Sequence, residues 1–162
     1  MDILWAPWRK EFILSKKEKG CIFCKRHNDT KDKKNLILFR GKLSFVIMNK
    51  YPYNTGHLMV APYRHVGKVE KLKEDELCEL AGLTQKCVVI LKKTMRPQGF
   101  NLGMNLEKVA GAGVVDHLHV HIVPRWTGDT NFMPLIGNTK LISVALKDVY
   151  NQLKSEFKKL KK

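Results

Sequence analysis

The chain has 162 residues, of which 44% are hydrophobic and 28% charged. This composition is typical of one globular domain with its own core, and it excludes disordered and fibrous proteins. Basic residues outnumber acidic ones by 30 to 15, and a net charge of +15 attracts polyanions such as nucleotides, nucleic acids and anionic membranes. The lysines are scattered, and most are expected on a solvated surface, so charge alone does not choose among these partners.

The first 34 residues show no clear hydrophobic period and end in a polar run at 27–34. They contain the pair Cys21-x-x-Cys24, so we expect an N-terminal arm followed by a zinc-type knuckle. The start of the chain lacks a secretory signal pattern, and apolar runs such as 87–91 are too short to cross a membrane. A cytoplasmic location is therefore expected. There, a C-x-x-C pair indicates metal binding or redox chemistry before a structural disulfide.

Three strand-like segments follow, at 36–39, 44–48 and 57–62. Gly41 separates the first two, and a turn-forming group ending at Gly56 precedes the third.

The hydrophobic period then changes to that of an amphipathic helix. Its repeating positions are Leu77, Leu80, Thr84, Cys87, Val88 and Leu91. Cys78 and Cys87 fall in this helix and are expected to be buried as small apolar side chains. Pro97 and Gly99 end it.

Two further strands are predicted, at 100–106 and 117–123, with a Gly- and Ala-rich loop at 109–113 between them and Pro124 stopping the second. A second amphipathic helix closes the chain, with an apolar face made of Ile142, Ala145, Val149, Leu153, Phe157 and Leu160. No repeat or linker divides the sequence. The predicted fold class is α+β, a single domain over residues 1–162 with a mainly antiparallel sheet of about five strands, a central helix packed on it and a C-terminal helix.

Three of the six histidines alternate with apolar residues within the segment 117–123. On a strand, His117, His119 and His121 share one face at intervals of roughly 7 Å, while the residues between them face the core. A neutral imidazole is a nucleophile near pH 7, and its attack on phosphorus gives a phosphoramidate that a second nucleophile can break. A metal site is the main alternative, because His-x-His on a strand is a common ligand pair. The second alternative has no function: the three histidines would simply face solvent.

This alternation resembles the core motif of the histidine-triad superfamily, His-φ-His-φ-His-φ-φ with φ apolar, and the motif is complete here. The resemblance extends to Trp5-Ala6-Pro7-Trp8-Arg9, Cys21-x-x-Cys24, Asn49, Gly56-His57-Leu58-Met59-Val60 and Arg125-Trp126-x-Gly128-Asp129-x-Asn131-Phe132. The Trp-rich start and the segment after the triad are most similar to the branch that holds fragile-histidine-triad hydrolases and bacterial diadenosine tetraphosphate phosphorylases.

The resemblance implies that His119 is the nucleophile that accepts a nucleotidyl group. His121 would bind the phosphate or bridging oxygen, and His57 would support the site from a neighbouring strand. The implied substrate contacts are Asn49 at the ribose, Phe23 at the base, Asn105 in the preceding loop, and backbone amides after Gly113 at the non-bridging oxygens. From the residues alone, His57 and Phe23 also fit the core, and Asn49 also fits a turn.

Tetrahedral zinc needs two ligands besides the thiolates of Cys21 and Cys24. His65 and His117 complete the set, and this ligand arrangement resembles that of zinc-containing relatives, including galactose-1-phosphate uridylyltransferases. The resemblance thus implies a closed structural zinc site that pins the arm against the sheet and withdraws His117 from acid–base chemistry. A redox C-x-x-C pair with an exposed His65 is the alternative.

The expected function is cleavage of nucleotidyl phosphoanhydrides, most plausibly diadenosine polyphosphates, by double displacement through nucleotidyl-His119. Mg²⁺ is the cation expected with such a substrate. Water or phosphate could end the reaction: similar phosphorylases have Gly-Ser where Ala112-Gly113 stand here, whereas Asn105 matches them. The glutamine of the polyphosphate hydrolases is missing from 106–108, so the sub-branch stays open.

Two other functions remain open. A nucleoside phosphoramidase would use the same histidines. A non-catalytic nucleotide- or nucleic-acid-binding protein is favoured by the net charge of +15 and the Lys-rich C-terminus, and it predicts strongly salt-dependent binding. The resemblance also implies a homodimer formed by joining two sheets.

Overall fold

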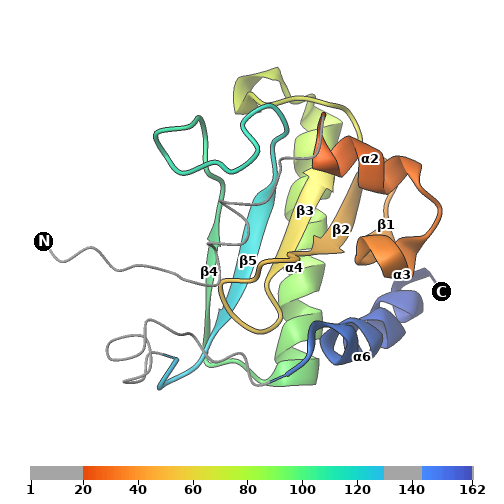
Figure 1. Ribbon diagram of the computed structural model, residues 1–162, viewed down its shortest axis with the longest axis vertical. Coiled ribbons are helices and arrows are strands. Elements are labelled where there is room, and N and C mark those ends of the chain that lie inside the picture. Colours follow the sequence, from red (N-terminus) through yellow and green to blue (C-terminus); the bar gives the residue numbers. More distant parts are fainter. Residues whose placement is uncertain (1–19, 130–143, 162) are drawn as a thin grey trace, which may run out of the picture.

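The computed structural model describes residues 20–129 and 144–161. Five strands form one antiparallel sheet in the order β1-β2-β3-β5-β4 (Figure 1). The strands are β1 (Ile37–Arg40), β2 (Ser44–Met48), β3 (Leu58–Pro62), β4 (Gly99–Gly103) and β5 (Val120–Arg125). The helices are α2 (Ile22–Asn28), α3 (Asp32–Asn35), α4 (Glu74–Met95) and α6 (Leu146–Lys158), with short 3-10 turns at Val69–Lys71 and Lys159–Lys161. The predicted α+β class is confirmed.

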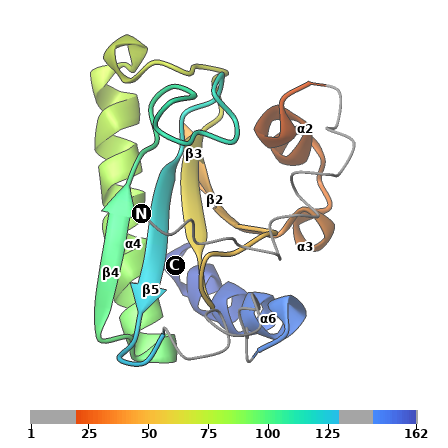
Figure 2. The same ribbon diagram turned by 60° about the vertical axis from the view of Figure 1, so that its left-hand side comes forward.

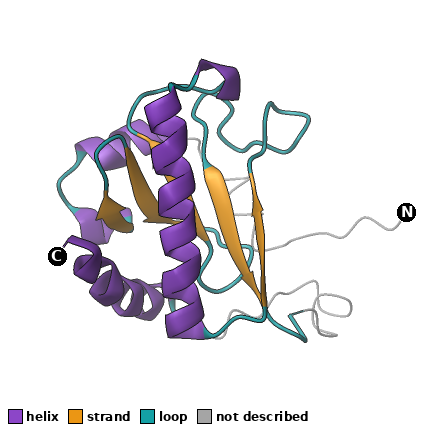
Figure 3. Cartoon of the chain, turned by 180° about the vertical axis from the view of Figure 1, so that it is seen from behind, coloured by secondary structure: helices purple, strands orange, loops and turns teal. Residues whose placement is uncertain are grey.

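Both faces of the sheet are covered, which explains why every residue of β2 and β3 is buried. Figure 2 shows α4 on one side of the sheet and α2 and α3 on the opposite side. Seen from behind, α4 runs along the sheet and α6 lies beside its lower end (Figure 3). Alternate strand residues therefore pack in two separate cores.

The larger core joins the sheet to α4 and α6 through apolar side chains that include Val46, Val60, Leu80, Leu91, Leu118, Ile122, Leu153 and Phe157. The smaller core lies under α2 and consists of Phe23, Ile37, Phe45, Ile47, Met59 and Ala61. On the α2 side, the part of the sheet that lies beyond the smaller core carries the candidate site.

Several sequence-based expectations need correction. The segment predicted as an irregular arm and knuckle contains α2 and α3, which are too short to show a reliable period. Cys78 is exposed whereas Cys87 is buried, because the two positions lie on different faces of α4. Leu77, predicted on the apolar face of that helix, is 46% exposed near its first turn.

The strand boundaries also differ. β4 ends at Gly103, not at 106, because its last partner is His121 and the chain then leaves the sheet. β5 begins at Val120 and includes Pro124, which lies beyond the end of β3 and pairs with β4 alone. A proline is tolerated where one side of a strand has no ladder.

Some predicted features lie outside the described residues: the Trp-rich start, Asn131, Phe132 and Ile142. Among the described helices, none is both long and apolar enough to cross a membrane.

Candidate active site and metal cluster

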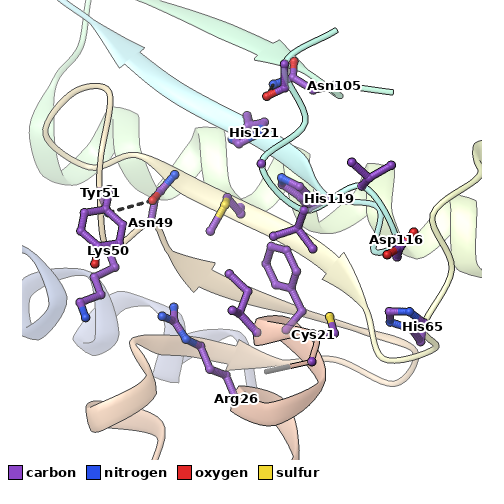
Figure 4. A pocket seen from close by; sticks show the side chains of 18 of the residues that line it. Cys21, Arg26, Asn49, Lys50, Tyr51, His65, Asn105, Asp116, His119 and His121 are labelled. Atoms are coloured by element: carbon purple, nitrogen blue, oxygen red, sulfur yellow. Dashed lines mark hydrogen bonds between the residues drawn. The ribbon is translucent and has the colours of Figure 1, made fainter. Parts of the chain in front are cut away.

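The antiparallel pairing of β3 with β5 sets the middle of the site. Met59 lies opposite His121 in this register, and His119 precedes β5 by one residue. A cavity of about 740 Å³ opens over this face of the sheet and is lined by both His119 and His121. The side chains that surround it come from α2, the connection after β2 and the loop before β5 (Figure 4).

His119 is held as a neutral imidazole with a defined tautomer. Its Nδ1 donates a hydrogen bond to the backbone carbonyl of His117 at 2.9 Å, so its Nε2 carries the lone pair. Burial lowers the pKa of His119, and the bond to the carbonyl only partly opposes that shift. An unprotonated ring nitrogen on a cavity wall is the group that nucleophilic attack requires.

His121 is oriented by a chain of two hydrogen bonds. The backbone N–H of Tyr53 donates to Nδ1 of His57 at 3.1 Å, which places the ring hydrogen of His57 on Nε2. That Nε2 donates to Nδ1 of His121 at 2.9 Å. The remaining hydrogen of a neutral His121 is then on its own Nε2, so this residue can act as a hydrogen-bond donor toward a ligand.

The expected substrate-binding residues line the same cavity: Phe23, Asn49, Asn105 and Gly113. The ring of Phe23 packs 4.8 Å from that of His119, centroid to centroid. Asn49 accepts the backbone N–H of Tyr51 through Oδ1 at 2.9 Å, and Asn105 reaches the carbonyl of Gly111 at 3.4 Å. Their placement is compatible with the expected contacts, and their roles stay predictions.

Among the cavity-lining side chains that sequence reasoning missed are Arg26, Lys50, Tyr51 and Asp116. Arg26 lies three residues after Phe23 on α2, so the two share one side of a helix. Treating this segment as irregular concealed that relation. The other three belong to loops, where no periodic signal exists.

Cys21, Cys24, His65 and His117 converge beside the cavity, with one ligand atom from each lying within 4.8 Å of the others. Nδ1 of His117 is 3.2 Å from Sγ of Cys21, 3.5 Å from Sγ of Cys24 and 3.3 Å from Nδ1 of His65. Zinc bonds of about 2.1 Å to nitrogen and 2.3 Å to sulfur would set tetrahedral ligands about 3.4 to 3.8 Å apart. The four residues therefore fit a metal ion of this size.

His117 is prepared to bind a metal through Nδ1. Its Nε2 donates to the carbonyl of Pro62 at 2.8 Å, and burial lowers its pKa to about 4, so Nδ1 has a lone pair. Within the described residues this is the only such His, Cys, Asp and Glu group, so the expected Mg²⁺ has no comparable ligand set there.

Known proteins share the domain family and the fold of this chain. The family model of the HIT domain matches residues 30–128. A Mycobacterium tuberculosis protein named AP-4-A phosphorylase is 41% identical over 162 residues, covering 95% of this chain and 83% of that protein. A bis(5'-nucleosyl)-tetraphosphatase of Schizosaccharomyces pombe is 32% identical over 93 residues, covering 57% of this chain and 50% of that protein.

The fold agrees with a solved structure. A Zn-bound histidine triad family protein from Mycobacterium smegmatis superposes with a TM-score of 0.70 at 20% identity, covering 88% of this chain and 96% of that one. The family model spans the sheet and the alternating histidines, and it includes His119 and His121 of the cavity. The chain therefore belongs to the HIT domain family.

Proposed function

We propose that this protein cleaves dinucleoside polyphosphates through a nucleotidyl-His119 intermediate. The observation that carries the proposal is the paired hydrogen bonding of the two cavity histidines. His119 is left with a lone pair on Nε2, while His121 is left with a hydrogen on Nε2. A nucleophile and a donor beside one cavity are what displacement at phosphorus requires. Relatives named AP-4-A phosphorylase and bis(5'-nucleosyl)-tetraphosphatase support this substrate class.

In the first step Nε2 of His119 attacks the phosphorus next to one nucleoside. The N–P bond forms as the bond from that phosphorus to the bridging oxygen breaks, and the rest of the polyphosphate departs with the electron pair. The ring hydrogen stays on Nδ1, and the carbonyl of His117 that accepts it stabilises the positive charge that develops on the imidazole. His121 donates to the oxygens that gain negative charge.

In the second step an oxygen nucleophile attacks the same phosphorus, the N–P bond breaks, and its electron pair returns to Nε2. Water would yield a nucleoside monophosphate and inorganic phosphate would yield a nucleoside diphosphate. We favour phosphate, because the similarity to the protein named AP-4-A phosphorylase covers 95% of this chain. Phosphate binding would rely on Asn105 and on backbone amides near Gly113, since no serine follows Ala112.

Zinc is the metal proposed for the Cys21, Cys24, His65 and His117 cluster, because two thiolates with two imidazoles are a preferred tetrahedral set. Four protein ligands close the coordination sphere, so the ion would have a structural role. It would fix α2 and its Phe23 against the triad.

Product analysis tests the function. Diadenosine tetraphosphate incubated with the protein and inorganic phosphate should give ATP and ADP, and without phosphate the yield of ADP should vanish. ATP and AMP in both conditions would mean hydrolysis. No cleavage in either condition, with rapid cleavage of a nucleoside phosphoramidate instead, would overturn the proposed substrate class.

A further inference from the structure

Two cationic side chains that have no role in the proposed reaction steps line one end of the cavity. Arg26 projects from α2, and Lys50 follows β2. Figure 4 shows both on the side of Asn49 and Tyr51, while His65 and Asp116 lie on the opposite side, with His119 between the two ends. Neither cation belongs to the metal cluster or to the hydrogen-bond chain through His57.

The floor of the cavity is apolar. It includes Ile22 and Phe23 from α2 and Met59 from β3, whose register partner is His121. The Phe23 ring is also in contact with that of His119. A polyphosphate chain laid over this floor would lose hydration without compensation, whereas a flat aromatic ring gains contact area. The apolar floor therefore favours a nucleobase between His119 and the cations.

The charged side chains on the polar rim of this end are hydrogen-bond donors. Arginine and lysine only donate hydrogen bonds. Oδ1 of Asn49 accepts from the backbone N–H of Tyr51, and its amide nitrogen adds two donor hydrogens to this end. Asp116 is the only carboxylate among the described residues that line the cavity, and it lies at the other end.

Purines differ at the edge that such a rim would meet. Guanine presents two neighbouring acceptors, O6 and N7, whereas adenine presents N7 beside a donor, its N6 amine. A guanidinium or ammonium group pairs with the two guanine acceptors and leaves the adenine amine without an acceptor. We propose that Arg26 and Lys50 form a nucleobase subsite that selects guanine-type 6-oxopurines over adenine. This inference rests on the proposed function, because it requires a nucleotide in the cavity.

Calorimetric titration of the zinc-loaded protein with GMP, IMP and AMP tests the subsite without turnover. The three nucleotides share the ribose and the phosphate, and IMP keeps O6 and N7 but lacks the N2 amine. GMP and IMP should both bind about tenfold more tightly than AMP, the size expected of one good bidentate pair. Arg26→Met and Lys50→Met should each reduce that preference while changing AMP affinity far less. Lys42→Met, an exposed lysine that does not line the cavity, is the control.

Equal or tighter binding of AMP by the wild-type protein would overturn the subsite. So would an equal loss of affinity for GMP, AMP and inorganic triphosphate in both variants, since the cations would then hold phosphate. Lys50 is exposed, so its variant keeps the test valid if Arg26→Met does not fold. Turnover separates the two proposals: a preference for GMP without cleavage of diguanosine or diadenosine tetraphosphate would contradict the proposed function alone. Cleavage of both with no base preference would contradict the subsite alone.

Discussion

At the scale of single residues, hydrogen bonds from neighbouring residues set the orientation of the His121 ring. His57 is 1% exposed and passes the orientation set by the Tyr53 backbone on to His121. Without this bond the His121 ring could turn or exchange its tautomer. The position of its donor relative to a ligand in the cavity would then be lost.

His121→Ala should lower kcat by about 10²- to 10³-fold, because one charge-stabilising donor is removed from the transition state. His57→Ala should lower kcat by less, since His121 remains present but loses its orientation. Steady-state kinetics with diadenosine tetraphosphate measure both. His27→Gln is the matched control, because His27 packs on Phe45 and Tyr63 outside the cavity. Wild-type turnover by His121→Ala would contradict the role given to this residue.

The sequence predicted which histidines share the site, but it did not predict the hydrogen-bond partners that orient them. Strict alternation placed His119 and His121 together, because a strand repeats every two residues. The Tyr53 backbone donor and the Pro62 and His117 carbonyl acceptors belong to the main chain, so no side-chain pattern could reveal them. The tautomers of the site are therefore a result of the fold.

At the scale of elements, α2 joins the metal cluster to the cavity. Cys21 precedes this helix and Cys24 lies within its first turn, while Phe23 between them is buried against His117 and His119. If the cluster holds the proposed zinc, its release would free the start of α2 and with it one wall of the cavity.

The purified protein should contain about one zinc ion per chain, the number that four tetrahedral ligands bind. Chelation should lower Tm and weaken nucleotide binding, because α2 loses its anchor. Cys24→Ser should show both effects without a chelator, and Cys78→Ser, at an exposed position outside the cluster, should show neither. Elemental analysis and thermal unfolding measure these outcomes. Protein isolated without zinc, or with Cys21 and Cys24 joined in a disulfide, would refute the assignment.

The segment that carries His65 is tied to α4 by an ion pair. Arg64 donates to both carboxylate oxygens of Glu76, at 2.8 and 2.6 Å, and to the carbonyl of Lys71. The hydrogen bond from Arg64 lowers the pKa of Glu76 to about 2, although burial opposes the shift. The hydrogen bond from the backbone N–H of Lys73 also lowers this pKa. A carboxylate with a depressed folded-state pKa stabilises the fold above its unfolded-state pKa, and this contribution is lost as the pH falls toward the folded-state value.

Glu76→Gln should therefore lower the free energy of unfolding by about 2 kcal/mol at neutral pH, the scale of a hydrogen bond to a charged group. The difference from wild type should shrink as the pH falls from about 4.5 toward 2, because protonation removes the same charge from the wild-type protein. Denaturant unfolding across this range measures it, with the exposed Glu74→Gln as control. A difference that stays constant with pH would show that the charge of Glu76 contributes nothing.

Long or fully buried elements were predicted best. The strand at 44–48 and the amphipathic helix that became α4 matched the structure, because burial on both faces or over six turns leaves a strong pattern. The seven residues of α2 make only two turns, and their helical conformation depends on packing against the smaller core. Strand ends such as Gly103 depend on the length of the partner strand, which a single segment does not encode.

At the scale of the whole molecule, the net charge of +15 is distributed over many exposed lysines. Such charges are screened beyond roughly 10 Å at 0.1 M salt, whereas contacts inside the cavity are short. Binding of unspecific DNA or RNA should therefore fall steeply between low and moderate salt, while cleavage of diadenosine tetraphosphate should fall much less. Parallel binding and activity titrations measure the two slopes. A sequence-specific nucleic-acid complex that persists at high salt would favour the binding-protein alternative.

The central claim of the proposed function is a covalent bond between Nε2 of His119 and the phosphorus of the substrate. Rapid quenching of the enzyme during turnover of diadenosine tetraphosphate, followed by mass spectrometry of its peptides, tests this bond directly. The account predicts an acid-labile, base-stable adenylyl adduct on His119, which is absent from His119→Ala together with all turnover. Cleavage with inversion at phosphorus and no adduct on His119 would show that the acceptor attacks the substrate directly, and it would contradict the double displacement proposed here.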